Sequence, residues 1–268
     1  MLIRLFFSKV NIVSQKKIAI VTGANSGLRK AFVEGLLQEP IDEIWAIARN
    51  EARLLEVQAL APQRIRIFSA DLTEPLSLSE FETTLTQEQP CVHYLVNNAG
   101  FAKFADYESL NMHESSNLID LNAKAVVQMA LRSIPFMNQG SCIINIGSLS
   151  AFLPLPYMNI YAATKVFVKN YSLALREELK PRGIHVTAVR PGWIDTNLYA
   201  RAEIGAKKSV NTFTGMVKPD VVAQKAIRDA KVNRPLSIYG FLPNAVRILA
   251  KFLPASLCMR LWMLQQKF

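Results

Sequence analysis

The sequence predicts an α/β protein with a single doubly wound parallel sheet, because strand-forming and helix-forming segments alternate along its 268 residues. Short apolar runs predict strands at 18–22, 43–48, 65–69, 92–96, 141–146 and 184–189. Apolar residues spaced about 3.6 positions apart predict helices at 27–38, 51–60, 76–87, 115–137 and 160–180. Alternation of this kind places helices on both faces of the sheet.

The chain divides into three parts by composition. Residues 18–240 have the length and pattern of one α/β domain. A short basic and apolar extension, 1–17, precedes this domain, and an amphipathic helical extension, 241–268, follows it. We expect the second extension to pack on or near the domain.

The first strand leads into a glycine-containing turn. Buried-type residues Ile18 to Val21 precede Thr22-Gly-Ala-Asn-Ser-Gly27, and a helix follows directly. Glycines at a strand-to-helix turn allow backbone N–H groups to approach a pyrophosphate at the helix N-terminus. The segment therefore predicts a dinucleotide-binding fold of the Rossmann type.

Arg29 departs from this pattern, because it stands where such loops have a third glycine. Its guanidinium suits a phosphate and can pair with one. Alternatively, the side chain crowds the loop and weakens cofactor binding. The sequence leaves both alternatives open.

The end of the second strand predicts which dinucleotide binds. An acidic residue there would bind the ribose 2′-hydroxyl, whereas an arginine accommodates a 2′-phosphate. Here the strand ends at Arg49-Asn50, and the nearest acid, Glu51, comes later. The pattern favours NADP(H) over NAD(H), although Arg49 could also be an ordinary solvated side chain.

Tyr161 and Lys165 are the most informative pair in the chain. They lie four residues apart in a predicted helix, and therefore on the same face, one turn apart. We expect the Lys165 ammonium to favour the phenolate and to lower the pKa of Tyr161 toward neutrality. Ser148 supplies a hydroxyl upstream, with Tyr157 and Ser150 as the rival phenol and hydroxyl.

Taken together, these residues resemble the short-chain dehydrogenase/reductase family in its single-domain form. The resemblance covers about residues 17–200 and rests on seven motifs in order. They are Thr22-Gly-Ala-Asn-Ser-Gly27, Asp71-Leu72, Asn97-Asn-Ala-Gly100, Asn122, Ser148, Tyr161-x-x-x-Lys165 and Pro191-Gly192-x-x-x-Thr196. The family fold would add a seventh strand near Leu236–Tyr239.

The resemblance implies a catalytic set. Tyr161 would be the general acid in reduction and the base in oxidation, while Lys165 would lower its pKa and hold the nicotinamide ribose. Ser148 would polarise the carbonyl, and Asn122 would anchor a water in the proton relay.

The resemblance also implies a cofactor-binding set, Tyr161 and Lys165 included. Thr196, in the segment that begins at Pro191 and Gly192, would contact the nicotinamide carboxamide. Gly23, Asn25, Ser26, Gly27 and Leu28 would line the diphosphate; Asp71, next to Leu72, would meet the adenine; Asn98, Ala99 and Gly100 would wall the adenosine pocket.

The predicted substrate side is apolar. Its expected walls contribute Leu149, Phe152, Leu153, Leu155, Tyr157, Met158, Trp193, Leu198, Tyr199, Phe213 and Met216. Such walls suit an apolar ketone or secondary alcohol, although interior packing would use the same residue types. Residues 201–218, interrupted by Gly205 and Gly215, predict a mobile lid.

The net charge of +10 is concentrated at the two ends of the chain. Residues 207–268 hold eleven basic and two acidic residues, and residues 1–17 hold four basic residues and no acid. Basic, apolar ends suit either packing over the substrate cleft or a subunit interface, or contact with a membrane surface through 1–17 and 241–268. Neither end is apolar for long enough to predict a spanning helix.

Other classes of partner are disfavoured. No interleaved aromatic platform indicates nucleic acid, and Cys91, Cys142 and Cys258 form neither a disulfide framework nor a metal spacing. We expect no metal and a reducing cytoplasm, with membrane association as the alternative location. The family resemblance suggests a homo-oligomer, which the apolar C-terminus could equally block.

The sequence therefore predicts an NADP(H)-dependent oxidoreductase that interconverts a ketone and a secondary alcohol on an apolar substrate. The alternative is a cofactor-impaired, non-catalytic binding protein on the same scaffold, because Arg29 replaces the third loop glycine.

Overall fold

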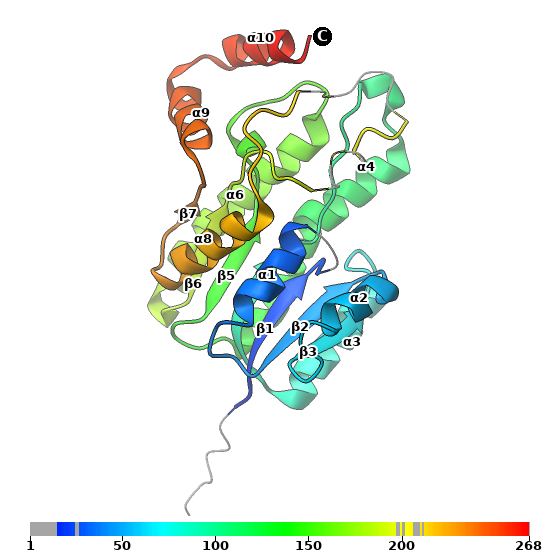
Figure 1. Cartoon of the computed structure of the whole chain (residues 1–268), viewed down its shortest axis with the longest axis vertical. Helices are drawn as coiled ribbons and strands as arrows, with labels where there is room; N and C mark the ends of the chain where they lie inside the picture. Colours follow the sequence, from blue (N-terminus) through cyan, green and yellow to red (C-terminus); the bar gives the residue numbers. More distant parts are fainter. Residues whose placement is uncertain are drawn as a thin grey trace, which may run out of the picture.

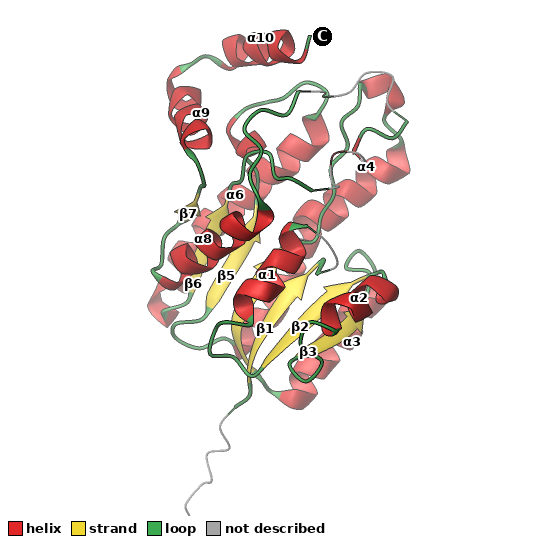
Figure 2. Ribbon diagram, in the orientation of Figure 1, coloured by secondary structure: helices red, strands yellow, loops and turns green. Residues whose placement is uncertain are grey.

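The computed structural model describes residues 15–24, 27–196, 199, 202–205, 210 and 212–267. One seven-stranded parallel sheet has the order β3-β2-β1-β4-β5-β6-β7, with helices on both faces (Figures 1 and 2). The strands are β1 (Lys17–Thr22), β2 (Glu43–Ala48), β3 (Ile65–Ser69), β4 (Cys91–Asn97), β5 (Cys142–Ile146), β6 (His185–Val189) and β7 (Leu236–Ser237). The strand order reverses beside β1, which confirms the doubly wound prediction.

The helices connect these strands and extend beyond the last one. They are α1 (Leu28–Leu36), α2 (Glu51–Gln58), α3 (Pro75–Glu88), α4 (Met112–Ile119), α5 (Ala125–Ser133), α6 (Asn159–Leu179), α8 (Pro219–Lys231), α9 (Phe241–Phe252) and α10 (Ala255–Gln266). Short 3₁₀ turns are η1 (Tyr107–Ser109), η3 (Ile134–Phe136), η4 (Leu149–Phe152) and η5 (Lys180–Arg182), and η2 (Asp120–Lys124) is a π-helical turn.

Two apolar layers hold the helices to the sheet. Ile18 and Ile20 of β1 face the layer formed with α3, α5 and α6, while Ala19 and Val21 face the layer formed with α1, α2 and α8. All four side chains are fully buried. A strand covered on both faces reads as a continuous apolar run, which is why β1 was recognisable in the sequence.

One predicted helix needs correction, and one observed helix was not predicted. The sequence predicts one helix over 115–137, but the chain forms α4, the π-helical turn η2 and α5 in succession. Helix α8 is absent from the sequence prediction, although Pro219 begins its first turn and Val222, Ala226 and Ala230 form its buried stripe. A proline in the first turn is compatible with a helix start, so the signal was present.

The C-terminal extension forms α9 and α10, which lie beyond the carboxyl ends of the strands (Figure 1). Trp262 of α10 donates its indole N–H to the carbonyl of Pro156 at 3.0 Å. Gln266 is fully buried and exchanges two hydrogen bonds with the backbone of Thr212, at 3.0 and 3.2 Å. These contacts join the end of the described chain to the domain; residues 1–14 of the N-terminal extension lie outside the described residues.

Candidate active site

A cleft of about 1220 Å³ runs along the carboxyl ends of the strands. One part is lined by the loops after β1, β2 and β4, and the other by η4, α6, the loop after β6 and the two C-terminal helices. Doubly wound sheets bind their ligands at this edge. The volume is at the upper end for a single small ligand, which leaves room for a dinucleotide beside a substrate.

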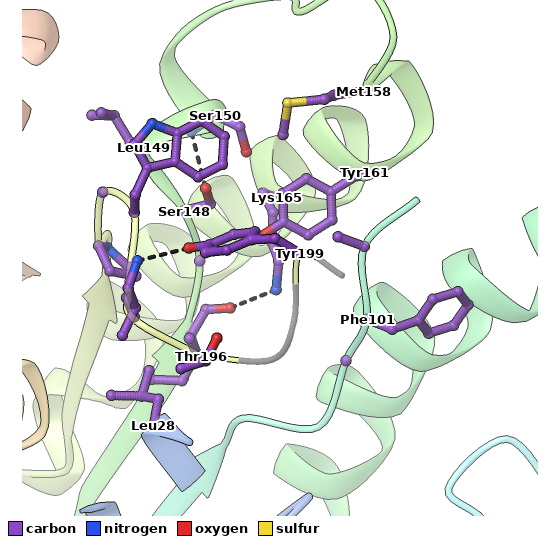
Figure 3. A pocket seen from close by; sticks show the side chains of 18 of the residues that line it. Leu28, Phe101, Ser148, Leu149, Ser150, Met158, Tyr161, Lys165, Thr196 and Tyr199 are labelled. Carbon is purple, nitrogen blue, oxygen red and sulfur yellow. Dashed lines mark hydrogen bonds between the residues drawn. The ribbon is translucent and has the colours of Figure 1, made fainter. Parts of the chain in front are cut away.

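Three of the four predicted catalytic side chains, Ser148, Tyr161 and Lys165, meet where these two parts of the cleft join (Figure 3). Ser148 follows β5 and begins η4, whereas Tyr161 and Lys165 occupy successive turns at the start of α6. Ser148 is close enough to the Tyr161 phenol to lower its pKa, and the Lys165 ammonium lies 5.6 Å from the centre of the Tyr161 ring. Lys165 donates to the Ile146 carbonyl at 2.9 Å, which fixes the ammonium at the end of β5.

Burial dominates the pKa values of this group. It raises the pKa of the Tyr161 phenol and outweighs the opposing effect of Ser148. The sequence predicted a lowered value through Lys165, so the net direction in this structure is opposite. The pKa of Lys165 is lowered to about 8 by burial and, secondarily, by the charge of Arg29.

Asn122 supports the cleft from behind and does not line it. Its side chain donates to the Phe101 carbonyl at 2.8 Å and accepts from the Phe101 amide at 3.0 Å. The Asn122 side-chain nitrogen also donates to the Thr164 hydroxyl of α6 at 3.4 Å. These bonds tie the loop after β4 to the helix that carries Tyr161, and the π-helical turn, unpredictable from the sequence, gives Asn122 its position.

The two rival residues have different positions. Tyr157 does not line the cleft, which leaves Tyr161 as the phenol near Ser148. Ser150 does line the cleft, and its amide donates to the Ser148 hydroxyl at 3.1 Å. The Ser150 hydroxyl is buried without a hydrogen-bond partner among the described residues. The cleft is therefore lined by two neighbouring serines, Ser148 and Ser150.

The nucleotide end of the cleft is shaped by close backbone approaches. Gly27 has φ +54°, and a Cβ there would lie 2.7 Å from Thr196 Cγ2. Gly23 has φ +69°, and its Cβ would lie 2.9 Å from Ala99 Cα. Most of the predicted cofactor set lines the cleft, namely Gly23, Gly27, Leu28, Arg49, Asn50, Asp71, Leu72, Asn98, Ala99, Gly100, Pro191, Gly192 and Thr196. Asn25 and Ser26 lie outside the described residues.

Thr22 is a positioning residue to which the sequence pattern assigns no role of its own. Its hydroxyl, at the end of β1, accepts from the amides of Asn98 and Ala99 at 2.9 and 3.0 Å. It also donates to the Val96 carbonyl at 3.3 Å. The Asn98 side-chain nitrogen is buried in the cleft wall without a partner among the described residues. An unmatched buried donor beside two constrained glycines fits a bound dinucleotide.

The groove holds two arginines beside the carboxyl end of β2. Arg49 and Arg53 both line it, and the sequence had pointed only to Arg49. Arg49 lies 3.3 Å from Asp71, whose other oxygen accepts from the amide and hydroxyl of Thr73. Burial tends to raise the pKa of Asp71, but these Thr73 bonds and Arg49 lower it overall. Asn50 accepts from the Arg53 amide at 2.9 Å and caps α2.

Arg29 reaches across the groove. Its guanidinium donates to the Gly100 carbonyl, joining the start of α1 to the loop after β4. A Cβ on Gly23 would lie 3.3 Å from Arg29 Nε, and Arg29 is close enough to lower the pKa of Lys165. The positive charge therefore lies within the path of the dinucleotide, where a diphosphate would meet it.

The substrate end of the cleft is apolar. Among the predicted walls, Leu149, Leu153, Leu155, Met158, Trp193 and Tyr199 line it, joined by Phe101, Ala102 and Phe104. Phe152, Tyr157, Phe213 and Met216 do not line it, and Leu198 lies outside the described residues. Phe152 instead packs against Arg190, whose guanidinium carbon lies 4.6 Å from its ring centre.

An aromatic cluster stands next to Tyr161. Phe104 contacts Tyr161 edge to face with ring centres 6.1 Å apart, and Trp193 and Tyr199 contact each other at 5.2 Å. Tyr199 accepts from the Ile194 amide at 2.7 Å, which holds the ring over the cleft. Rings fixed in this way present a rigid apolar wall to a substrate.

The C-terminal helices complete the apolar end. Leu242, Val246, Leu249, Leu253, Leu261 and Trp262 line the cleft. Pro243 is buried. It packs closely on Gly192 in the loop after β6, since a Cβ added to Gly192 would lie 3.2 Å from Pro243 Cγ. The extension therefore reaches the cofactor-side loop as well as the substrate pocket.

Neither the acids nor the thiols of the cleft form a metal centre. Across the described ranges, no group of three His, Cys, Asp or Glu side chains has an arrangement that could hold a metal ion. Cys91, Cys142 and Cys258 are free and buried, and burial raises the pKa of the Cys142 thiol to about 12.

Comparison with protein families identifies the same part of the chain. The model of the short chain dehydrogenase family matches residues 17–206. An uncharacterized oxidoreductase of Staphylococcus epidermidis is 28% identical over 198 residues, which are 73% of this chain and 86% of that protein. An uncharacterized oxidoreductase of Staphylococcus aureus is 32% identical over 190 residues, which are 69% of this chain and 80% of that protein.

Solved structures show the same architecture. A short-chain dehydrogenase from Sphingobium yanoikuyae in complex with NADPH aligns with a TM-score of 0.73 and 27% identity over 89% of this chain and 96% of that chain. The bulky-bulky ketone specific alcohol dehydrogenase from Comamonas testosteroni aligns with a TM-score of 0.69 and 26% identity over 88% and 94%. The chain therefore belongs to the short-chain dehydrogenase family and is an NAD(P)-dependent oxidoreductase.

Proposed function

We propose that this protein is an NADP(H)-dependent reductase or dehydrogenase that interconverts a ketone and a secondary alcohol on an apolar substrate. The observation that carries the proposal is the meeting of Ser148, Tyr161 and Lys165 at the junction of the constrained groove and the apolar pocket. A carbonyl placed at this junction lies between a hydride donor and a proton donor.

The side chains divide the work in reduction. Ser148 hydrogen-bonds the carbonyl oxygen and orients it, while Tyr161, kept protonated by its raised pKa, gives that oxygen a proton. Tyr161 becomes a phenolate when it gives up its proton, and the Lys165 ammonium stabilises that charge. The same groups run in reverse for oxidation, with Tyr161 as the base. Asn122 holds Phe101 and Thr164 in place, and its predicted water contact belongs to this proposal.

The groove residues support NADP(H) as the cofactor. When bound, it would supply or accept the hydride at the carbonyl carbon. Gly23 and Gly27 allow the close approach that a diphosphate needs, and Asn98 has an unmatched donor for it. Arg49 and Arg53 favour a ribose 2′-phosphate, in keeping with the NADPH bound to the Sphingobium yanoikuyae enzyme.

The apolar walls support a bulky substrate without charge. Trp193, Tyr199 and Phe104 form one side of the pocket, and the C-terminal helices form the other. The Comamonas testosteroni relative is described as specific for bulky-bulky ketones, which is consistent with a pocket of this kind. The three buried thiols suit a reducing cytoplasm, which is the compartment we propose.

Tyr161→Phe tests the mechanism. A panel of aliphatic, aromatic and steroid ketones, offered with NADPH and with NADH, is followed by the absorbance of the reduced nicotinamide. The variant should lose about 10²- to 10⁴-fold in kcat, the range for a lost general acid, while its Kd for NADPH changes little. Tyr157→Phe is the matched control and should keep wild-type turnover. Full turnover by Tyr161→Phe would refute the assignment.

Arg29 supports a second candidate function, because its side chain lines the groove and bonds to Gly100. If the guanidinium blocks the dinucleotide, the protein binds apolar ligands without catalysis. Titration of NADPH against the wild-type chain and Arg29→Gly separates the two functions. Binding only after the change would support the non-catalytic alternative, whereas tight binding by both proteins would eliminate it.

A further inference from the structure

Helix α9 carries an exposed apolar stripe. Phe241, Ile248 and Phe252, spaced seven and four residues apart, are 88%, 56% and 79% exposed. Residues at this spacing share one face of a helix. Three large side chains on one short helix face exceed the scattered apolar exposure that a protein surface normally shows.

Helix α10 repeats this feature on the side away from its contacts with the domain. Leu257, Leu261 and Leu264 are 41%, 52% and 74% exposed and lie four and three residues apart. The opposite face holds Trp262 and Gln266, which bond to Pro156 and Thr212. The helix is therefore anchored by one face and leaves an apolar face open.

The charges around these stripes have one sign. Arg247, Lys251, Arg260 and Lys267 are the charged side chains of residues 241–268, which hold no acid. In the described ranges, none of these four cations is paired with a carboxylate. Positive charge also continues into the domain, since Arg247 contributes after burial to the lowering of the pKa of Arg190 to about 10.

The open face is continuous with the substrate pocket. Leu242, Leu249 and Leu261 line the cleft and are nevertheless 46%, 54% and 52% exposed. These leucines belong both to the wall of the cleft and to the accessible surface of α9 and α10. Leu261 is also a member of the α10 stripe, so this stripe adjoins the apolar end of the cleft.

We propose that α9 and α10 dock on the surface of an anionic lipid bilayer and that the apolar substrate enters the cleft from that bilayer. The stripes would lie at the boundary between headgroups and acyl chains, with the lysines and arginines at the lipid phosphates. The contact is interfacial, because no helix of the described chain is long and apolar enough to cross a membrane. Docking goes beyond the proposed function and is independent of it, whereas substrate entry rests on it.

A second copy of the chain suits this face less well. A two-fold interface brings the same patch of each copy together. Arg247, Lys251 and Arg260 would then face their own counterparts without intervening acids, and like charges repel at such an interface. An anionic lipid surface offers charge of the complementary sign.

Co-sedimentation of the full chain with vesicles tests the proposal. Phosphatidylcholine vesicles are compared with vesicles that also contain phosphatidylserine. The chain should bind the anionic vesicles, and salt should weaken the binding. Lys251→Gln/Arg260→Gln should weaken it about 25-fold, from about fivefold for each cation near the surface. Phe241→Ser/Phe252→Ser should weaken it at least about tenfold through lost apolar burial.

The control is Leu76→Ser/Leu131→Ser, which removes two leucines of comparable exposure from α3 and α5 and should leave binding unchanged. No binding to anionic vesicles, or equal binding by all three double variants, would overturn the proposal. A dimer that Phe241→Ser/Phe252→Ser dissociates, in a chain that ignores vesicles, would assign the face to a second copy. Tyr161→Phe should bind vesicles like the wild type, so docking and catalysis fail separately.

Discussion

Arg29 and Lys165 place two positive charges in the same cleft, both beside Gly100. Arg29 begins in the first turn of α1 and bonds to the Gly100 carbonyl, while Lys165 is fixed to the Ile146 carbonyl. Burial and the Arg29 charge together lower the pKa of Lys165 to about 8. A diphosphate bound beside them would neutralise part of this repulsion, so we expect cofactor binding to be coupled to the protonation of Lys165.

The first prediction concerns pH. A group with a lowered pKa loses its proton at a lower pH, so the Lys165 ammonium is present below about pH 8 and lost above it. Reduction should therefore slow as the pH rises through about 8. Arg29→Gln removes a repulsive charge, raises the pKa of Lys165 and should move this alkaline limb upward. The measurement is kcat/KM for NADPH as a function of pH. An alkaline limb at the same pH in the variant and the wild type would contradict an effect of the Arg29 charge on the pKa of Lys165.

The second prediction concerns the choice of dinucleotide. Arg49→Gln removes a cation that would pair with the 2′-phosphate, so the Kd for NADPH should rise by about 10- to 100-fold, the worth of a charge-assisted hydrogen bond. The Kd for NADH should hardly change. Arg228→Gln is the control, because that residue of α8 does not line the cleft. Equal losses for NADPH and NADH in Arg49→Gln would contradict a 2′-phosphate contact.

The third prediction separates backbone strain from steric blockage. Gly27→Ala introduces a Cβ at φ +54° and 2.7 Å from Thr196 Cγ2, so both stability and NADPH affinity should fall. Gly140→Ala is a matched control, because Gly140 has φ +84° with nothing within 4 Å of the added Cβ. It should lose about 1–3 kcal/mol of stability without a change in NADPH affinity. Thermal unfolding and calorimetric titration measure the two effects.

The fourth prediction concerns the fastening of α10. Trp262→Phe keeps a ring in the pocket wall but removes the bond to the Pro156 carbonyl. We expect KM for an apolar ketone to rise about fivefold, corresponding to roughly 1 kcal/mol for one hydrogen bond, with the Kd for NADPH unchanged. Leu264→Ala, on the exposed face of the same helix, should leave KM as it is. A fall in NADPH affinity in Trp262→Phe would point to general loosening of the cleft.

The sequence predicted the sheet well because its strands are buried on both faces. The short apolar runs at β1 and β2 are typical of strands covered on both faces. Their predicted bounds differ from the observed ones by at most one residue. The seventh strand was harder to delimit, since β7 covers only Leu236–Ser237 of the expected Leu236–Tyr239. A two-residue strand depends on its partner β6 more than on its own composition.

The side-chain contacts across the cleft could not be predicted from the sequence. The spacing placed Tyr161 one turn from Lys165, but the direction of the Tyr161 pKa depends on burial, which a helix pattern does not report. Likewise, the sequence shows that Arg29 replaces the third loop glycine. It does not show that the side chain bonds to the Gly100 carbonyl, because Gly100 lies 71 residues away. Asn122 and Thr22 behave in the same way, because their partners come from other strands and loops.

The bonds from Trp262 and Gln266 to the domain mean that the last helical turns are part of the wall around the substrate. We therefore expect substrate selectivity and catalysis to depend on different segments of the chain. Under the proposed function, exchange of α9 and α10 between relatives should change which substrate is accepted, while Ser148 after β5 and Tyr161 and Lys165 on α6 remain untouched. The end of the chain is thus the natural place to redesign this catalyst.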